Sequence, residues 1–128
     1  MSEDGKKDAL KDSSYQFALK IILLCRKLQI EEKEYIISKQ LAKSGTSIGA
    51  NIEEASGAQS TNDFIAKFHI SLKEARESNY WLRLLKDSGL ITLVEYDELI
   101  KELNFIINML TKSLKTAKNN LDKDKGQK

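Results

Sequence analysis

Few side chains in this sequence have the chemistry of a catalytic nucleophile or base. His69 is the single histidine and Cys25 the single cysteine. A cysteine nucleophile needs a base within hydrogen-bond reach, and no spacing in the sequence predicts that these two residues lie together. We interpret His69 as an exposed or partly packed side chain and Cys25, at the end of the apolar run 21–25, as a small buried hydrophobe. The sequence therefore predicts no catalytic residue.

Closely spaced carboxylates are the other candidates for chemistry, because hard cations prefer oxygen ligands. They occur as Glu53 with Glu54 and as Glu74 with Glu77. Helical bundles that hold two iron ions use a Glu-x-x-His motif on two helices, and alanine stands three positions before His69. We expect these glutamates to face solvent or to form salt bridges, with no metal site and no cofactor. A metal-dependent enzyme that uses acidic residues inside a bundle is kept as a remote alternative.

The periodicity of the apolar residues places these side chains on helices. Apolar positions recur at spacings of three and four residues, and the β-branched residues follow the same spacing instead of alternating. Short connections between long amphipathic helices require antiparallel neighbours. The predicted fold is an all-α, antiparallel up-and-down four-helix bundle. Its parts are a disordered leader over residues 1–12, helices over about 13–29, 31–58, 61–87 and 92–120, and a basic flexible tail over 121–128.

Two of the predicted helices begin with capping signals. Ser60 with Asp63, and Thr92 with Glu95, have the spacing of a capping box, in which the first side chain accepts a hydrogen bond from the backbone N–H three residues later. Gly89 is suited to the left-handed conformation that ends many helices. These residues predict a short turn around Gly89 between the third and fourth helices.

The first predicted helix is apolar over an unusually wide face. Its apolar residues form two neighbouring stripes of helical spacing, one with Ala18, Leu19, Ile22 and Leu23 and one with Phe17, Ile21, Leu24 and Leu28. A helix that is hydrophobic over most of its circumference is usually buried. We therefore expect this helix to lie well inside the bundle.

The second predicted helix is rich in small residues. Between positions 42 and 50 it contains Ser44, Gly45, Ser47, Gly49 and Ala50. An internal glycine costs a helix about 1 kcal/mol relative to alanine, so something must offset this loss. Two interpretations stay open, close approach of a neighbouring helix and a groove or subunit contact. The polar stripe with Asn51 and Glu54 either fixes the register of a partner helix or faces solvent.

The bulk composition excludes several classes of protein. The chain has 128 residues, of which 41% are hydrophobic and 31% charged, and a net charge of +2, as is typical of one soluble domain. No apolar run approaches the ~18 residues of a membrane-spanning helix. With one cysteine and no apolar secretory leader, we expect a cytoplasmic protein that contacts no membrane. The basic part of the chain is residues 112–128, with six lysines and two aspartates.

Two segments resemble a known family. Residues 46–55, T-S-I-G-A-N-I-E-E-A, are similar to the signature T-S-I-P/G-A-N-I-x-E-G of the bacterial four helix bundle family. Residues 71–91, S-L-K-E-A-R-E-S-N-Y-W-L-R-L-L-K-D-S-G-L-I, resemble the third helix and turn of many members. The family includes proteins encoded in intervening sequences of 23S ribosomal RNA genes, and the accessory variability determinant (Avd) of diversity-generating retroelements. The resemblance covers about residues 14–120.

The resemblance implies an antiparallel four-helix protomer that assembles into a homopentamer. For the retroelement branch it implies a pentamer that binds a reverse transcriptase and nucleic acid through a basic exterior. Ser47, Asn51 and Glu54 match the family motif by position, and Ala55 replaces its usual glycine. Lys43 stands where members often have a basic pair.

The first functional hypothesis is a non-enzymatic oligomeric scaffold of the rRNA intervening-sequence protein type, associated with RNA, DNA or a protein partner. Wide apolar faces on the helices exceed what one small bundle core absorbs. Ile70, Tyr80 and Trp81 lie beyond the main apolar seam of their helix. Because extra apolar surface on a helix face predicts a subunit interface, these three residues are the interface candidates.

The second hypothesis is an Avd-like accessory protein that binds nucleic acid or a reverse transcriptase. Its candidate contacts are Lys43, Lys112, Lys115 and Lys118. Repetition of the basic chain end in an oligomer would create a strong local field. The alternative interpretation is a solvated helix end, because lysines are favoured near a helix carboxyl terminus.

Overall fold

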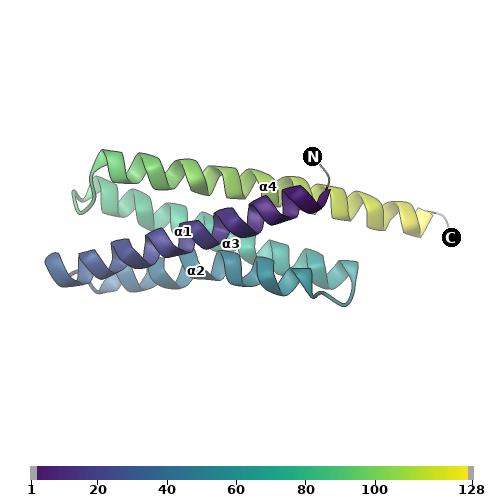
Figure 1. Cartoon of the computed structure of the whole chain (residues 1–128), viewed down its shortest axis with the longest axis horizontal. Helices are drawn as coiled ribbons and strands as arrows, with labels where there is room; N and C mark the ends of the chain where they lie inside the picture. Colours follow the sequence, from purple (N-terminus) through teal and green to yellow (C-terminus); the bar gives the residue numbers. More distant parts are fainter. Residues whose placement is uncertain (1–2, 127–128) are drawn as a thin grey trace.

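Four helices make up the part of the chain that the computed structural model describes, residues 3–126, with side chains described for residues 9–124. They are α1 (Glu3–Glu31), α2 (Ile36–Ser56), α3 (Thr61–Asp87) and α4 (Leu93–Gly126). Residues 3–126 contain no strand. Figure 1 shows the helices running along the long axis of the molecule, with the carboxyl-terminal end of α4 extending beyond the others. The predicted all-α, antiparallel four-helix bundle is confirmed.

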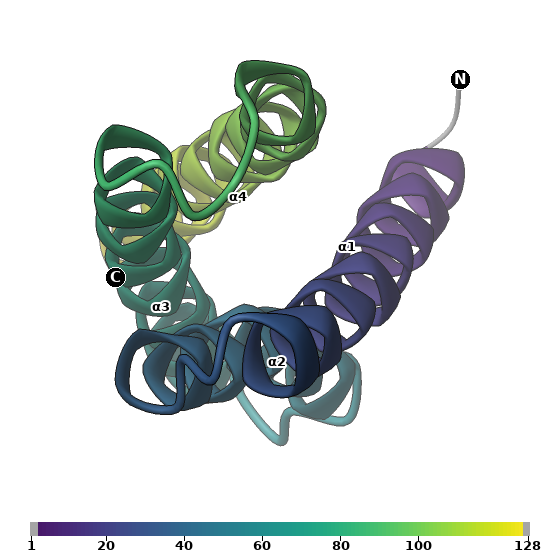
Figure 2. The same ribbon diagram turned by 90° about the vertical axis from the view of Figure 1, so that its left-hand side faces the viewer.

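Each helix packs on the helix that precedes or follows it in the chain. α2 contacts both α1 and α3, and α3 contacts α4, whereas α1 and α4 contact each other least. Among the described residues, no Cα atoms of a diagonal helix pair lie within 8 Å of each other. Figure 2, viewed toward one end of the bundle, shows α1 and α4 diverging on the open side of this arrangement. The bundle is therefore tightly packed along three helix pairs and loosely joined along the fourth.

The core contains one apolar stripe from each helix. Its fully buried large apolar side chains are Leu10, Phe17, Ile21, Leu28, Leu41, Ile48, Leu82, Leu85, Leu103, Ile106 and Leu110. Within each helix these residues recur at spacings that place them on one face. The buried side chains therefore recur at the same spacing of three and four residues from which the helices were predicted.

The start of α1 differs from the prediction. The leader predicted to be disordered over residues 1–12 is helical from Glu3 onward, and residues 1–2 lie outside the described part. Leu10 and Ser14 are buried, in helical register with Phe17. Burial of Leu10 in the core stabilises the helical turns that precede residue 13.

Only one of the two apolar stripes of α1 is buried. Phe17, Ile21, Leu24 and Leu28 face the core, whereas Leu19, Ile22 and Leu23 are exposed. The prediction that this helix lies well inside the bundle is therefore wrong. The physical reason is that α1 has one close neighbour, α2, and one loosely packed neighbour, α4.

The second helix begins later than predicted, at Ile36 instead of residue 31. Lys33, in the connection, has a φ of 55°, which turns the chain out of the helix. The Glu34 carboxylate then accepts hydrogen bonds from the backbone N–H groups of Ile36 (3.2 Å) and Ser38 (2.7 Å). Glu34 thus supplies the cap that the sequence pattern did not reveal.

The helix ends show a second difference near the carboxyl terminus. The segment predicted as a flexible tail over 121–128 continues α4 as far as Gly126, and residues 127–128 lie outside the described part. α2 ends at Ser56, two residues before the predicted 58. α3 has the predicted bounds, and α4 begins one residue after the predicted start.

Both predicted caps are present. The Ser60 hydroxyl accepts a hydrogen bond from the backbone N–H of Asp63 (3.0 Å). The Thr92 hydroxyl accepts from the N–H of Glu95 (3.1 Å), and the Glu95 carboxylate accepts from the N–H of Thr92 (3.0 Å). Gly89 has the predicted left-handed conformation, with a φ of 79°.

Candidate interaction surfaces

The small residues of α2 allow α1 to approach closely. A Cβ atom at Gly45 would lie 2.9 Å from Cγ2 of Ile21, and one at Gly49 would lie 3.3 Å from the Ser14 hydroxyl oxygen. Ile21 is fully buried, so it has little room to move. Between the two interpretations of these glycines, the contacts therefore favour close helix packing.

On its other side α2 is hydrogen-bonded to α3 through buried serines. The hydroxyls of Ser44 and Ser78 lie 2.9 Å apart, and the Ser71 hydroxyl donates to the backbone carbonyl of Ile48 (2.8 Å). Buried polar groups are tolerated only when they are hydrogen-bonded. These bonds satisfy the serines and fix the register of α2 against α3.

The three family-motif residues lie along the outer side of α2. The Ser47 hydroxyl donates to the carbonyl of Lys43 (2.7 Å), and the Asn51 amide donates to the carbonyl of Ser47 (2.8 Å). The Glu54 carboxylate pairs with Lys67 of α3 at 2.8 Å, which raises the pKa of that lysine. One motif residue therefore links two helices, and the other two bond to their own helix.

The predicted interface residues of α3 are at least partly exposed, with Tyr80 and Trp81 in contact and Ile70 about 15 Å away along the helix. Ile70 and Tyr80 are exposed, and Trp81 is half-buried, with its ring edge against Tyr80 (5.0 Å between centroids). Leu84, one turn further along, is also exposed. We define the α3 face as Ile70, Tyr80, Trp81 and Leu84; sequence reasoning missed Leu84, although its spacing from Tyr80 and Trp81 is helical.

Two carboxylates border the α3 face. The Glu77 carboxylate accepts a hydrogen bond from the Trp81 ring nitrogen (3.3 Å). Partial burial, together with the nearby charge of Glu77, raises the pKa of Glu74. Neither glutamate forms an ion pair with a described residue. The charges of Lys73 and Lys43 nevertheless act on Glu74, and Arg83 lies over the Tyr80 ring, so this side of α3 carries charges of both signs.

A second apolar surface lies on α1, where the sequence predicted burial. Tyr15, Leu19, Ile22 and Ile30 are 41–66% exposed and share one side of the helix by their spacing. We define these four residues as the α1 face. Arg26 completes their spacing, is exposed, and forms no ion pair with a described residue. The α1 face is opposite the buried stripe of the same helix, so within residues 9–124 its four side chains stay partly exposed to solvent.

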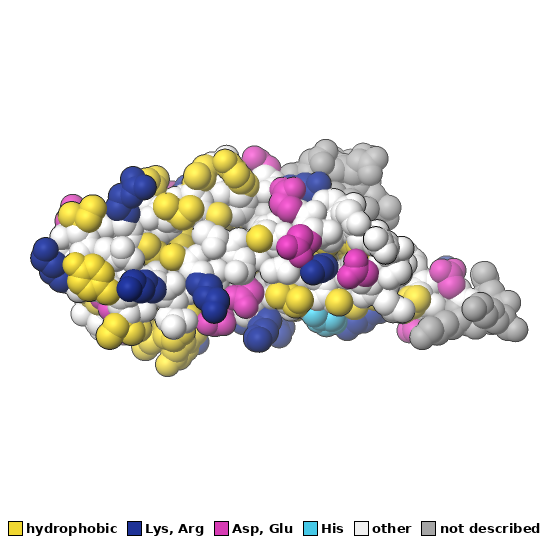
Figure 3. All heavy atoms as spheres, turned by 90° about the horizontal axis from the view of Figure 1, so that it is seen from below, with side chains coloured by type: hydrophobic (Ala, Val, Ile, Leu, Met, Phe, Trp, Pro, Cys, Tyr) yellow, Lys and Arg dark blue, Asp and Glu magenta, His cyan; other side chains and the backbone are white. Residues whose placement is uncertain are grey.

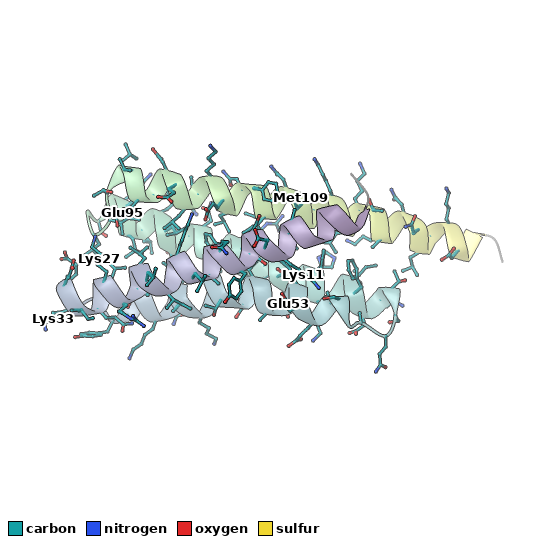
Figure 4. All side chains as sticks on the ribbon, viewed as in Figure 1. Lys11, Lys27, Lys33, Glu53, Glu95 and Met109 are labelled. Atoms are coloured by element: carbon teal, nitrogen blue, oxygen red, sulfur yellow. The ribbon has the colours of Figure 1, made fainter. Side chains whose placement is uncertain are left out.

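Ion pairs cross the loosely packed side between α1 and α4. Lys20 contacts the carboxylates of both Glu98 (3.3 Å) and Glu102, which raises its pKa. Lys27 pairs with Glu95 at 3.6 Å, and both side chains are labelled in Figure 4. Because these groups are partly exposed, each pair contributes little to stability.

Next to these ion pairs α1 and α4 enclose an open hollow of about 570 Å³. It is lined by Asp12, Ser13, Gln16, Glu98, Lys101, Glu102 and Phe105. The lining charges have both signs, and Glu102 is already engaged by Lys20. The hollow therefore has the mixed charge that is typical of a contact between two helices.

The candidate nucleic-acid contacts do not form one cluster. Lys112, Lys115 and Lys118 are exposed and belong to the carboxyl-terminal part of α4, whose yellow end projects from the bundle in Figure 1. Lys43 is exposed in the middle of α2, close enough to Glu74 to affect its pKa. The structure therefore groups the three α4 lysines and separates them from Lys43.

Cys25 and His69 lie in different environments. Cys25 is buried, and this burial raises the pKa of its thiol to about 11. His69 is exposed, and Figure 3 shows it in cyan at the surface. A thiol with this pKa is almost entirely protonated near neutral pH.

Two further properties hold for the described residues. They contain no group of three or more His, Cys, Asp or Glu side chains that could hold a metal ion. In the same part of the chain, none of the helices has the length and apolarity needed to cross a membrane.

Comparison with known proteins identifies a family and a structural relative of the chain. The sequence profile of the 23S rRNA-intervening sequence protein family matches residues 6–112. The chain is also similar to a crystal structure, determined at 1.70 Å resolution, of a protein of unknown function from the S23 ribosomal protein family of Bacteroides thetaiotaomicron VPI-5482. The two chains are 45% identical with a TM-score of 0.84, and the match covers 86% of this chain and 98% of the other. No curated protein gives a significant match.

The profile match extends from near the start of α1 into α4, as far as residue 112, and the solved relative has the same arrangement of helices over nearly its whole length. Both findings agree with the resemblance seen in the segments 46–55 and 71–91. The chain therefore belongs to the 23S rRNA-intervening sequence protein family.

Proposed function

We propose that this protein is a non-enzymatic oligomeric scaffold whose assembled copies present a surface to RNA or to a nucleoprotein. The observation that carries the proposal is the α1 face, because its four large apolar side chains lie opposite the core stripe and are left uncovered. Exposed apolar patches of this kind mark interaction sites. A cytoplasmic location, as expected for a chain with one buried thiol, is part of the proposal.

The energetics favour self-association. Complete burial of a large apolar side chain contributes about 1.5–3 kcal/mol relative to its exposure. The members of the α1 face are partly exposed, so covering them contributes on the order of several kcal/mol before the entropic cost of association. The exposed residues of α3 add to this gain if the same assembly covers them.

The absence of catalytic function is argued from the state of the reactive groups. The thiol of Cys25 is buried and protonated, and the carboxylates of Glu95, Glu98 and Glu102 are engaged in ion pairs with lysines. A general acid or base must reach its substrate and have a pKa near the working pH. None of these groups meets both conditions.

Size-exclusion chromatography with light scattering tests the scaffold proposal. At micromolar concentration we expect a mass that is a multiple of the 14.5 kDa protomer, with five copies as the number implied by family resemblance. A single species of 14.5 kDa under these conditions would contradict the proposal.

A second candidate function, direct nucleic-acid binding, is favoured by the projecting basic end of α4. Oligomerisation would bring several copies of Lys112, Lys115 and Lys118 into one assembly, and each phosphate contact adds to the salt dependence of binding. Replacing all three lysines by glutamine should weaken binding to RNA and reduce the salt slope. Lys39→Gln, on the exposed side of α2, is the matched control. RNA binding that is unchanged by the triple substitution would exclude the basic end of α4 as the contact with RNA.

A further inference from the structure

α1 and α4 are held together differently from the other neighbouring helices. Lys20 and Lys27 of α1 form ion pairs with three carboxylates of α4, those of Glu95, Glu98 and Glu102. We define these five residues as the α1–α4 seam. Among the described residues, no ion pair joins α1 to α2 or α3 to α4. The contact between α1 and α4 therefore depends on partly exposed charges more than the other helix contacts do.

Two adjoining hollows weaken the packing along the α1–α4 seam. Beside the hollow of about 570 Å³ lies a second one of about 290 Å³, and Glu98 lines both. The apolar lining of the smaller hollow consists of Leu23, Leu24 and Leu99. α1 and α4 also have the fewest contacts of the neighbouring helices, and Figure 2 shows them diverging. Low contact density is characteristic of the parts of a fold that open locally.

The α1–α4 seam also contains a buried carboxylate oxygen that lacks a donor. Oε1 of Glu102 accepts from Lys20, whereas Oε2 of the same carboxylate is buried and has no hydrogen-bond partner among the described residues. A buried acceptor without a donor costs free energy. Separation of α1 from α4 would expose this oxygen to water and remove that cost. The closed seam thus includes one group that opening stabilises.

We propose that α1 and α4 separate reversibly along the α1–α4 seam, more often at high ionic strength, while α1 stays packed on α2. The paired side chains are 30–63% exposed, and the Debye length falls from about 10 Å at 0.1 M salt to about 3 Å at 1 M, so salt screens them. Ile21 holds α1 on α2 by its close contact with Gly45, which screening does not weaken. Separation uncovers Leu24 and Leu99, which are 8% and 5% exposed in the closed bundle.

Thiol labelling of proteins with a single cysteine tests this opening. Leu99→Cys in a Cys25→Ala chain places the thiol in the α1–α4 seam. Wild-type Cys25 reports on the contact between α1 and α2, because its thiol lies against the backbone of Ala42. Val94→Cys in the Cys25→Ala chain is exposed and gives the reference rate at each salt concentration.

The expected salt effect follows from the strength of exposed ion pairs. Each pair changes an equilibrium by up to about fivefold. Relative to the reference, labelling at position 99 should therefore rise about threefold to tenfold between about 0.1 and 1 M sodium chloride. Labelling of Cys25 should change by less than about twofold, since α1 stays on α2. Leu24→Cys, on the α1 side of the seam, is a second probe that should give the same increase as Leu99→Cys.

Charge removal tests the cause of the opening at constant salt. Lys20→Gln with Lys27→Gln, in the chain with Leu99→Cys, removes the ion pairs of the seam. Labelling at position 99 should then be about threefold or more faster at 0.1 M salt and should lose most of its salt dependence. Lys67→Gln removes the ion pair between α2 and α3 and is the matched control, which should label like its parent.

Two outcomes would overturn the proposal. Labelling at positions 24 and 99 that responds neither to salt nor to the two lysine substitutions would show that the ion pairs do not control the seam. Equal acceleration at positions 99 and 25 would show that α1 leaves α2, or that the whole chain unfolds, instead of a local separation of α1 from α4.

Discussion

A Cβ atom at Gly45 in α2 would lie 2.9 Å from Cγ2 of Ile21 in α1, closer than side chains pack. Ile21 is β-branched and fully buried, so its Cγ2 methyl group cannot rotate away without displacing its neighbours. The glycine thereby sets how closely the two helices approach.

Gly45→Ala should lower the free energy of unfolding. Overpacking costs about 1–3 kcal/mol, and the better helix propensity of alanine returns only about 1 kcal/mol. Urea unfolding at fixed protein concentration measures the difference. Gly49→Ala is the matched control, because its added Cβ lies 3.3 Å from the Ser14 hydroxyl, and it should be nearly neutral. A stabilised Gly45→Ala protein would mean that α1 shifts freely against α2.

Thr92→Ala should destabilise the start of α4 by about 1 kcal/mol, the usual effect of removing a helix cap. The variant loses the hydroxyl that accepts from the N–H of Glu95. Thr111→Ala serves as control, since its hydroxyl bonds to the carbonyl of Ile107 within the same helix and is exposed. Equal thermal stability of the two variants would contradict a role for the capping box.

Acidification should reduce stability through Glu95. The pKa of Glu95 is lowered, first by the hydrogen bond from the Thr92 backbone and further by Lys27. A depressed pKa in the folded state contributes stability that is present above the unfolded value, about 4.3 for a glutamate. This contribution is lost as the pH falls through the folded pKa.

Urea unfolding between about pH 3 and pH 7 measures the effect of Glu95. Glu95→Gln should flatten the fall in stability at the acidic end. Glu74→Gln should act in the other direction, because the pKa of Glu74 is raised and its charged form is disfavoured in the fold. That variant should be neutral or stabilising at pH 7. Parallel pH profiles for the wild type and Glu95→Gln would exclude the proposed linkage.

Cys25 should react with thiol reagents only when the chain opens. Its burial and a pKa of about 11 leave far less thiolate than an exposed cysteine has, so labelling at pH 8 should be at least about a hundredfold slower. Labelling in denaturant should proceed at the rate of a free thiol. Val94→Cys provides an exposed thiol in the same fold. Fast labelling of Cys25 in the native protein would show that α1 detaches readily.

Periodicity and capping residues were sufficient to predict the number of helices and, to within one residue, where α3 and α4 begin. The caps at Ser60 and Thr92 could be predicted because they are local in the sequence. In each, a side-chain hydroxyl accepts a hydrogen bond from the backbone N–H three residues later. α3 accordingly has its predicted bounds, and α4 differs by one residue at its start. Where the cap comes from a less typical residue, as with Glu34, the predicted start was wrong. The start of α1 was also predicted wrongly, because the burial of Leu10 depends on residues that are distant in the chain.

The sequence by itself determined which side chains share a face of each helix, and hence the four-helix fold and the family. Only the tertiary structure decided which of two apolar stripes on α1 became core. Helical spacing places Phe17 and Ile21 on one side and Leu19 and Ile22 on another, but it contains no information on where the neighbouring helices lie. Because α1 packs closely on α2 alone, the stripe with Phe17 is covered within the protomer. The stripe with Leu19 stays exposed at the surface of the protomer.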